Sequence, residues 1–157
     1  KDVFVSLQFT NDHSESENHN MLERLSEIIN KYRHFNFYLS NHPRFNNNVD
    51  LTDLLRFPNA LLSRDSLFQN LSKCSLHLTV YSTTIFDASL QGIPTHIIKM
   101  NNEKFDLIYN QLEYPLKDVS LDELYSNYSV YSSEVKKWAR EYYKPFDKEL
   151  FLSILKK

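Results

Sequence analysis

Residues 82–94 read STTIFDASLQGIP, and this stretch decides the fold class of the chain. It follows an apolar run at residues 76–81, which is typical of a buried strand, and residues 95–98 return to a strand-like pattern. A strand, a short helix and a second strand that follow one another so closely predict a βαβ unit with short connections. The sequence therefore predicts two parallel strands here.

The ends of this helix are marked by residues with known capping preferences. Thr84 suits the N-cap, with Asp87 three residues later as the acid of a capping box. Gly92, the only glycine in the chain, suits the left-handed position after the helix, and Pro94 prevents its continuation. We therefore expect the helix to run from Thr84 to just before Gly92.

The same alternation of apolar runs and helical spacing extends along the chain. It predicts one domain, residues 1–157, built as a doubly wound parallel sheet with helices on both faces, a Rossmann-like α/β fold. Further strands are expected at 3–9, 35–39 and 60–63. Further helices are expected at 21–32, 51–56, 66–73, 103–110, 121–125, 133–143 and 147–155.

Ligands of doubly wound sheets bind at the carboxyl ends of the strands, near the point where the strand order reverses. The loops at 9–20, 40–48, 62–66 and 82–84 all follow predicted strands, so they should share this rim. Residues 10–20 are polar and are expected to form a flexible loop. Their His, Asp and Glu residues follow no metal-ligand spacing, so we expect no metal site there.

The composition excludes several classes of protein. With one glycine in 157 residues there is no Gly-rich phosphate loop, so a phosphate would have to be held by helix N-termini, hydroxyls and cations. A formal net charge of −2 gives no basic field for nucleic acid. A single cysteine, Cys74, permits no internal disulfide, and no apolar run is long enough to span a membrane, so we expect a cytoplasmic protein.

Three successive hydroxyls, those of Ser82, Thr83 and Thr84, stand at the predicted start of the short helix. Helix capping would use one or two of them. The amides and the dipole at a helix N-terminus attract anions, so a third hydroxyl favours a phosphate-binding turn. Ordinary capping is the alternative interpretation.

Residues 82–94, in the form Ser-Thr-Thr-x-x-Asp-Ala-x-x-x-Gly-x-Pro, resemble the nucleotide-binding segment in the C-terminal half of GT-B glycosyltransferases, where Glu is commoner than Asp87. The predicted order of elements over residues 58–84 is similar as well. The pair His42-Pro43 ahead of such a turn is similar to bacterial sialyltransferases and to capsule or teichoic-acid polymer transferases. The chain contains no Asp-x-Asp, which argues against a metal-dependent GT-A transferase.

The resemblance covers roughly residues 1–112 and implies that the rim binds a nucleotide-sugar donor. In that family, side chains of this half neutralise the charge that grows on the leaving phosphate. His42 would take this catalytic role, because an imidazole donates a hydrogen bond to a phosphate whether it is neutral or protonated. The alternative is a loop histidine without a partner.

The other residues that the resemblance implies in donor binding also lie on the predicted rim or beside it: Arg44, Leu62, Ser63, Ser82, Thr83, Thr84 and Asp87. Arg44 would add a fixed positive charge, and Leu62 and Ser63 would meet the nucleobase. Asp87 would accept hydrogen bonds from a ribose, unless it caps the helix at Thr84. Neither a metal nor a cofactor is implied.

The expected partners follow from the same resemblance. The acceptor site and the general base would belong to an N-terminal half, so residues 1–157 would be the C-terminal, donor-binding half of a larger, metal-independent glycosyltransferase for surface polysaccharide or glycoconjugate synthesis. By itself the chain would bind nucleotide weakly and would catalyse sugar transfer poorly. The longer protein would be cytoplasmic, with peripheral association with a membrane, and would not bind nucleic acid.

Other interpretations stay open. Residues 2–7 look like the opening strand of TIR-like signalling modules, although the later Trp-Cys-x-x-Glu-Leu motif of that family is absent. A third interpretation is that the chain is a degenerate donor domain, which no longer takes part in catalysis and serves as a scaffold.

An aromatic group stands near the C-terminus, formed by Trp138, Tyr142, Tyr143 and Phe146. We expect these side chains to pack a helix onto the sheet. A patch for a membrane surface or a domain interface is the alternative.

Overall fold

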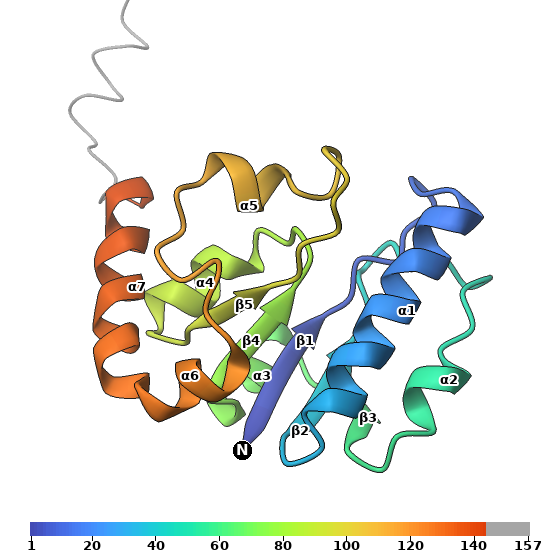
Figure 1. Ribbon diagram of the computed structural model, residues 1–157, viewed down its shortest axis with the longest axis horizontal. Helices are drawn as coiled ribbons and strands as arrows, with labels where there is room; N and C mark the ends of the chain where they lie inside the picture. Colours follow the sequence, from blue (N-terminus) through green and yellow to red (C-terminus); the bar gives the residue numbers. More distant parts are fainter. Residues whose placement is uncertain (144–157) are drawn as a thin grey trace, which may run out of the picture.

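The computed structural model describes residues 1–143, and within them five strands form one central sheet (Figure 1). The strands are β1 (Asp2–Ser6), β2 (Asn36–Ser40), β3 (Ala60–Leu62), β4 (Leu76–Thr79) and β5 (Thr95–Ile97). Their order is β3-β2-β1-β4-β5, and every neighbouring pair is parallel. The predicted doubly wound parallel sheet is confirmed, and its strand order reverses between β1 and β4.

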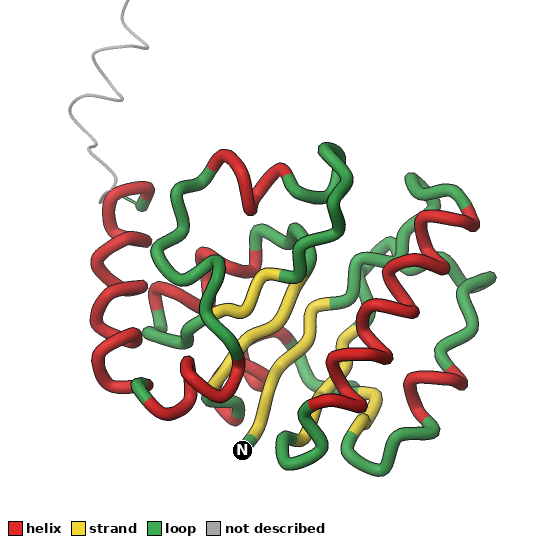
Figure 2. Tube along the Cα trace, in the orientation of Figure 1, coloured by secondary structure: helices red, strands yellow, loops and turns green. Residues whose placement is uncertain are grey.

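Helices cover both faces of this sheet, and Figure 2 shows the strands as the central layer. In chain order the helices are α1 (Glu15–Lys31), α2 (Thr52–Leu55), α3 (Leu67–Lys73), α4 (Thr84–Leu90), α5 (Leu107–Gln111), α6 (Leu121–Ser126) and α7 (Tyr128–Tyr142). The chain moves outward from β1 to β3 and then returns past β1 to β4 and β5. Because parallel crossovers are right-handed, this reversal places α1 and α2 on one face and α3 and α4 on the other.

Strand β1 is buried on both sides. Val3 packs in the larger core with Ile29 of α1. Phe4, which points the other way, packs in a second core with Leu71 of α3 and Ala88 of α4. A central strand that is covered on both faces is apolar in successive residues instead of alternating, as residues 3–5 of β1 are.

The predicted βαβ unit is confirmed as β4, α4 and β5. Gly92 follows α4 with a φ of 78°, in the left-handed region. Its amide donates to the carbonyl of Ser89 at 2.9 Å, and the Ile93 amide donates to the carbonyl of Ala88 at 2.9 Å. This pair of hydrogen bonds is the Schellman motif that ends a helix, and it explains why the single glycine stands here.

Helix α1 begins earlier than predicted, so the expected flexible loop over 10–20 is wrong from residue 15 onward. Ser14 is the N-cap, and its hydroxyl accepts from the Glu17 amide at 3.2 Å. The Glu17 carboxylate in turn accepts from the Ser14 amide at 2.8 Å. The polar first turns belong to the exposed face of α1, so the apolar spacing that marks the helix starts only at Met21.

Other element boundaries differ from the prediction. The strands expected at 3–9 and 76–81 end at Ser6 and Thr79. Helix α5 begins at Leu107 instead of residue 103, because the Asp106 carboxylate holds a turn by accepting from the Met100 and Asn102 amides at 2.8 and 3.1 Å. Helix α7 begins at Tyr128 instead of residue 133. The helix expected at 147–155 lies outside the described residues.

The aromatic group near the C-terminus packs against α4 instead of the sheet. Trp138 is 7% exposed, and its ring stacks on Phe86 with centroids 5.1 Å apart. Tyr142 and Tyr143 are about half exposed, and Phe146 lies outside the described residues. Over residues 1–143, none of the helices is both long and apolar enough to cross a membrane.

Candidate functional site

The carboxyl ends of β1, β2 and β4 surround a cavity of about 310 Å³, here called the rim cavity. Its walls come from residues 6–8 after β1, residues 40–43 after β2 and residues 82–84, which we call the hydroxyl turn, after β4. The cavity therefore lies where the strand order reverses, which is the usual ligand position in such sheets. The structure brings His42 and the hydroxyl turn together, as the topology argument predicts.

The hydroxyl turn holds itself in shape by internal hydrogen bonds. The Ser82 amide donates to Thr79 Oγ1 at 3.2 Å. Ser82 Oγ donates to Thr84 Oγ1 at 2.8 Å and accepts from the Thr84 amide at 3.2 Å. These bonds leave no capping role for Thr84, so the predicted capping box with Asp87 is wrong.

Thr83 is the residue of the hydroxyl turn that remains available to a ligand. It occupies the N-cap position of α4 but makes no side-chain capping bond. Its side chain is exposed and lines the rim cavity. Two of the three hydroxyls therefore organise the helix start, and the third makes no capping bond; phosphate binding by this turn stays a prediction.

His42 presents a hydrogen-bond donor to the rim cavity. The Arg44 amide donates to His42 Nδ1 at 3.0 Å. Nδ1 is then an acceptor, so the neutral ring carries its proton on Nε2. Partial burial and the Arg44 guanidinium hold the pKa of His42 below its usual value, which keeps the ring neutral near pH 7.

A buried histidine beneath the rim cavity was not found from the sequence. His77 on β4 is completely buried, and its Nε2 lies 2.7 Å from Ser6 Oγ, which lines the cavity. Its Nδ1 lies 3.0 Å from Thr95 Oγ1, and its ring stacks on Phe4. Burial lowers the pKa of His77 to about 3, so the ring stays neutral and fixes the Ser6 hydroxyl by a hydrogen bond.

A second cavity, of about 240 Å³, adjoins the rim cavity and shares Gln8 and His42 with it. Arg44 lines this cavity and pairs with Asp12 at 3.0 Å. Gln8 is 5% exposed, and within residues 1–143 its Oε1 has no hydrogen-bond partner. A buried acceptor without a partner is costly, so Gln8 marks a place where a ligand donor would be stabilising.

Three of the predicted binding residues lie outside both cavities. Ser63 has a structural role, since its hydroxyl donates to Asn70 Oδ1 at 2.7 Å and accepts from the Asp65 amide at 3.2 Å. Leu62 is 43% exposed on the edge strand β3. Asp87 lies along α4 beyond the hydroxyl turn and does not line the rim cavity.

No three His, Cys, Asp or Glu side chains gather in residues 1–143 in a way that could bind a metal ion. In the polar segment before α1, His13 is instead buried, and its Nε2 lies 2.6 Å from the hydroxyl oxygen of Tyr81.

The chain matches no protein-family model and no curated protein sequence. What the domain does is therefore inferred from the residues that meet at the rim. These residues form a small site whose polar side chains are uncharged, and it lies where the strand order of the parallel sheet reverses.

Proposed function

We propose that this domain binds the nucleotide-activated sugar donor of a GT-B-type glycosyltransferase, with the donor phosphate in the rim cavity. The observation that carries the proposal is the meeting of His42 and the hydroxyl turn in one cavity at the reversal point of the sheet. The same two sequence features carry the resemblance to that family.

The chemistry of the rim suits a leaving phosphate. His42 Nε2 and the Thr83 hydroxyl are donors that no capping role occupies. Two fixed donors would stabilise negative charge as it grows on the phosphate oxygens, and they would need no reorganisation to do so. His77 and Ser6 hold the floor of the cavity and do not titrate near neutral pH.

The size of the site favours a ligand that extends beyond the rim cavity. About 310 Å³ is at the lower end for a small-molecule site, and the adjoining cavity, which is also lined by His42, adds about 240 Å³. In this proposal the phosphate lies at His42, between a nucleoside on one side and the sugar on the other.

The remaining parts of the reaction belong to another part of a longer protein in this proposal. That part would supply the acceptor site and the general base for surface polysaccharide or glycoconjugate synthesis. The longer protein would be cytoplasmic and peripherally attached to a membrane. Residues 1–143 contribute donor binding and charge neutralisation.

Calorimetric titration with CMP, CDP, UDP and GDP tests the proposal. One of these nucleotides should bind, and Thr83→Ala and His42→Ala should each weaken it about ten- to hundredfold, because a hydrogen bond to a charged phosphate contributes about 1.5–3 kcal/mol. His34→Ala is the matched control, since His34 pairs with Asp122 at the opposite edge of the sheet. Unchanged affinity in both rim variants would refute the proposed site.

Asp87→Ala decides how far the ligand reaches along α4. The missing capping box means that this change should cost little stability. A large loss of nucleotide affinity would show a ribose contact, as the resemblance implies. Unchanged affinity would confine the ligand to the residues that line the two cavities.

A further inference from the structure

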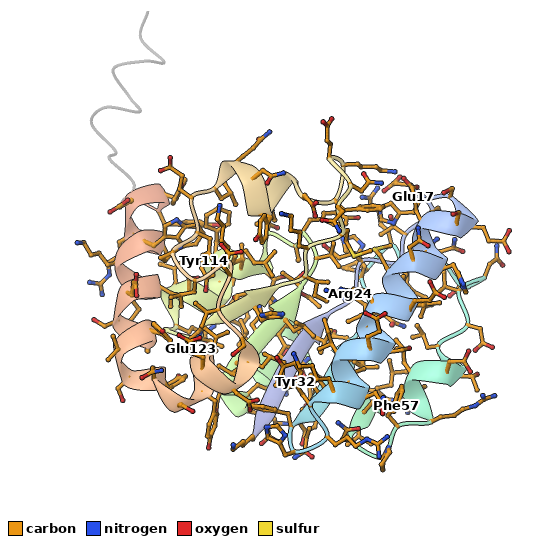
Figure 3. All side chains as sticks on the ribbon, viewed as in Figure 1. Glu17, Arg24, Tyr32, Phe57, Tyr114 and Glu123 are labelled. Carbon is orange, nitrogen blue, oxygen red and sulfur yellow. The ribbon has the colours of Figure 1, made fainter. Side chains whose placement is uncertain are left out.

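A third cavity, of about 380 Å³, lies between α1 and the segment that follows β5, and we call it the α1–β5 cavity. It shares no residue with the rim cavity or with the cavity that adjoins it. Arg24 of α1 and Tyr32, the residue that follows α1, line this cavity, and both are labelled in Figure 3. The volume is ordinary for a small-molecule site, so the cavity needs an explanation separate from donor binding.

Cations from different segments converge on the α1–β5 cavity. Four basic side chains line it, those of Arg24, Lys31, Lys99 and Lys117. Only two carboxylates do so, those of Glu27 and Asp118. Glu27 accepts from Arg24 at 2.6 Å, and Asp118 accepts from the Tyr109 hydroxyl. Both carboxylates therefore have partners, and none of the ion pairs formed within residues 1–143 involves the three lysines.

Two of these lysines share one aromatic ring. Lys99 Nζ lies 4.9 Å and Lys117 Nζ lies 5.2 Å from the centroid of Tyr109. The face of a tyrosine attracts an ammonium group, so the Tyr109 ring holds two positive charges beside the cavity, and neither lysine forms an ion pair within residues 1–143. An anion that entered the cavity would be attracted by both charges, so the arrangement favours an anionic ligand.

His96 adds a neutral acceptor to the same cavity. Its Nδ1 lies 2.9 Å from the Val119 carbonyl oxygen, and a carbonyl can only accept. The proton is therefore on Nδ1, and Nε2 carries a lone pair that no residue in the described part of the chain uses. Burial, with Lys31 and Arg24 nearby, lowers the pKa of His96 and keeps the ring neutral. A neutral Nε2 accepts a hydrogen bond from a ligand hydroxyl.

We propose that the α1–β5 cavity binds a small phosphorylated molecule that also carries a hydroxyl, such as a polyol or sugar phosphate. The phosphate lies between Lys99 and Lys117, and the hydroxyl donates to His96 Nε2. Ile28 and Ile97 form the apolar wall beside them. This site is independent of the nucleotide-sugar site at the rim.

The test is a titration of the full chain with glycerol 3-phosphate, inorganic phosphate and glycerol, followed residue by residue in ¹H–¹⁵N correlation spectra. Glycerol 3-phosphate should cause saturable shifts at 97–99 and 117–120, inorganic phosphate should bind there more weakly, and glycerol should not bind. Lys99→Ala and Lys117→Ala should each weaken the binding about tenfold. Lys73→Ala, which removes an exposed charge paired with Asp65, should leave it unchanged.

His96→Asn tests the hydroxyl contact separately. The Asn side chain keeps a donor for the Val119 carbonyl but lacks the second ring nitrogen. Glycerol 3-phosphate should then bind no better than inorganic phosphate does. Equal affinity of the unmodified chain for glycerol 3-phosphate and inorganic phosphate would overturn the hydroxyl contact. If Lys73→Ala weakened the binding as much as Lys99→Ala does, the binding would be non-specific attraction between charges, and the proposed site would be overturned. Shifts at the hydroxyl turn alone would place the phosphate at the rim and overturn this proposal while leaving the rim site in place.

Discussion

At the residue scale, the chemistry of the rim is decided by which polar atoms already have partners. Ser82 and Thr84 satisfy each other, and the Arg44 amide occupies His42 Nδ1. The groups that remain for a ligand include two donors, the Thr83 hydroxyl and His42 Nε2, and one acceptor, Gln8 Oε1. The satisfied groups hold the geometry of the rim, and in the proposed function the two free donors would bind the phosphate.

His77 makes the stability of the domain sensitive to acid. The pKa of His77 is about 3 in the folded chain, against 6.5 for an unperturbed histidine, so between these values the unfolded chain binds a proton that the folded chain does not. Stability should therefore fall as the pH drops below 6.5, by up to about 1.4 kcal/mol per pH unit from this residue. Urea unfolding at a series of pH values measures this slope.

His77→Gln is the control for that slope. It keeps a polar group near Ser6 but has no titrating ring, so it should be less stable at pH 7 and less sensitive to pH. The lowered pKa values of His13, His42 and His96 act in the same direction and remain in the variant. An unchanged slope in His77→Gln would show that His77 does not control the acid response.

Gly92 is the residue whose backbone conformation matters most. Its φ of 78° is unfavourable for other residues, and an added Cβ would overlap Ser132 and Lys136 of α7. Gly92→Ala should lower the free energy of unfolding by about 1–2 kcal/mol from the backbone term alone. Thermal melts of Gly92→Ala beside Gly92→Ala/Ser132→Ala/Lys136→Ala separate the backbone cause from the overlap, and an unchanged melting temperature in the single variant would contradict this account.

At the scale of the element, capping motifs mark some helix boundaries in this structure and not others, and the one at Ser14 was not used in predicting where α1 begins. Ser14 and Ser66 each begin a Ser-x-x-Glu or Ser-x-x-Gln sequence, and both form the capping box. Thr84 also has an acid three residues later, but it forms no capping box. The Ser82 hydroxyl already accepts the hydrogen bond from the Thr84 amide that the box would need. A local motif therefore predicts a cap only where no closer hydroxyl competes for the same amide.

Ser14→Ala tests how far the cap stabilises α1. Loss of the hydroxyl frees the Glu17 amide, so the free energy of unfolding should fall by about 1 kcal/mol. Ser16→Ala, an exposed change within the same first turn, should cost nothing or stabilise slightly, because Ala favours the helix. Chemical denaturation measures both variants, and equal effects would contradict the capping role.

At the scale of the whole molecule, the topology was predictable because the β4–α4–β5 unit has clear boundaries. The meeting of His42 with the hydroxyl turn followed from that topology alone, since the carboxyl ends of parallel strands share one edge. The contact of His77 with Ser6 did not, because it depends on the register that pairs Ser6 with Thr79 across two strands. A lone histidine in an apolar run carries no such information in the sequence.

The two proposed sites lie at different places on the sheet, so they can be separated in one experiment. The rim cavity is built from the ends of β1, β2 and β4, whereas the α1–β5 cavity is built from α1, β5 and the segment after β5. A nucleotide is expected at the first site and a small phosphorylated molecule at the second.

The central claim is that the rim cavity binds a nucleotide, and ¹H–¹⁵N correlation spectra recorded during titration with CMP, CDP, UDP and GDP test it most directly. For at least one of these nucleotides, we predict saturable shifts in the amides of residues 7–8, 41–42 and 82–84. We predict that Thr83→Ala weakens this response about ten- to hundredfold. Absence of shifts at these residues with all four nucleotides, or shifts confined to the α1–β5 cavity, would contradict the claim.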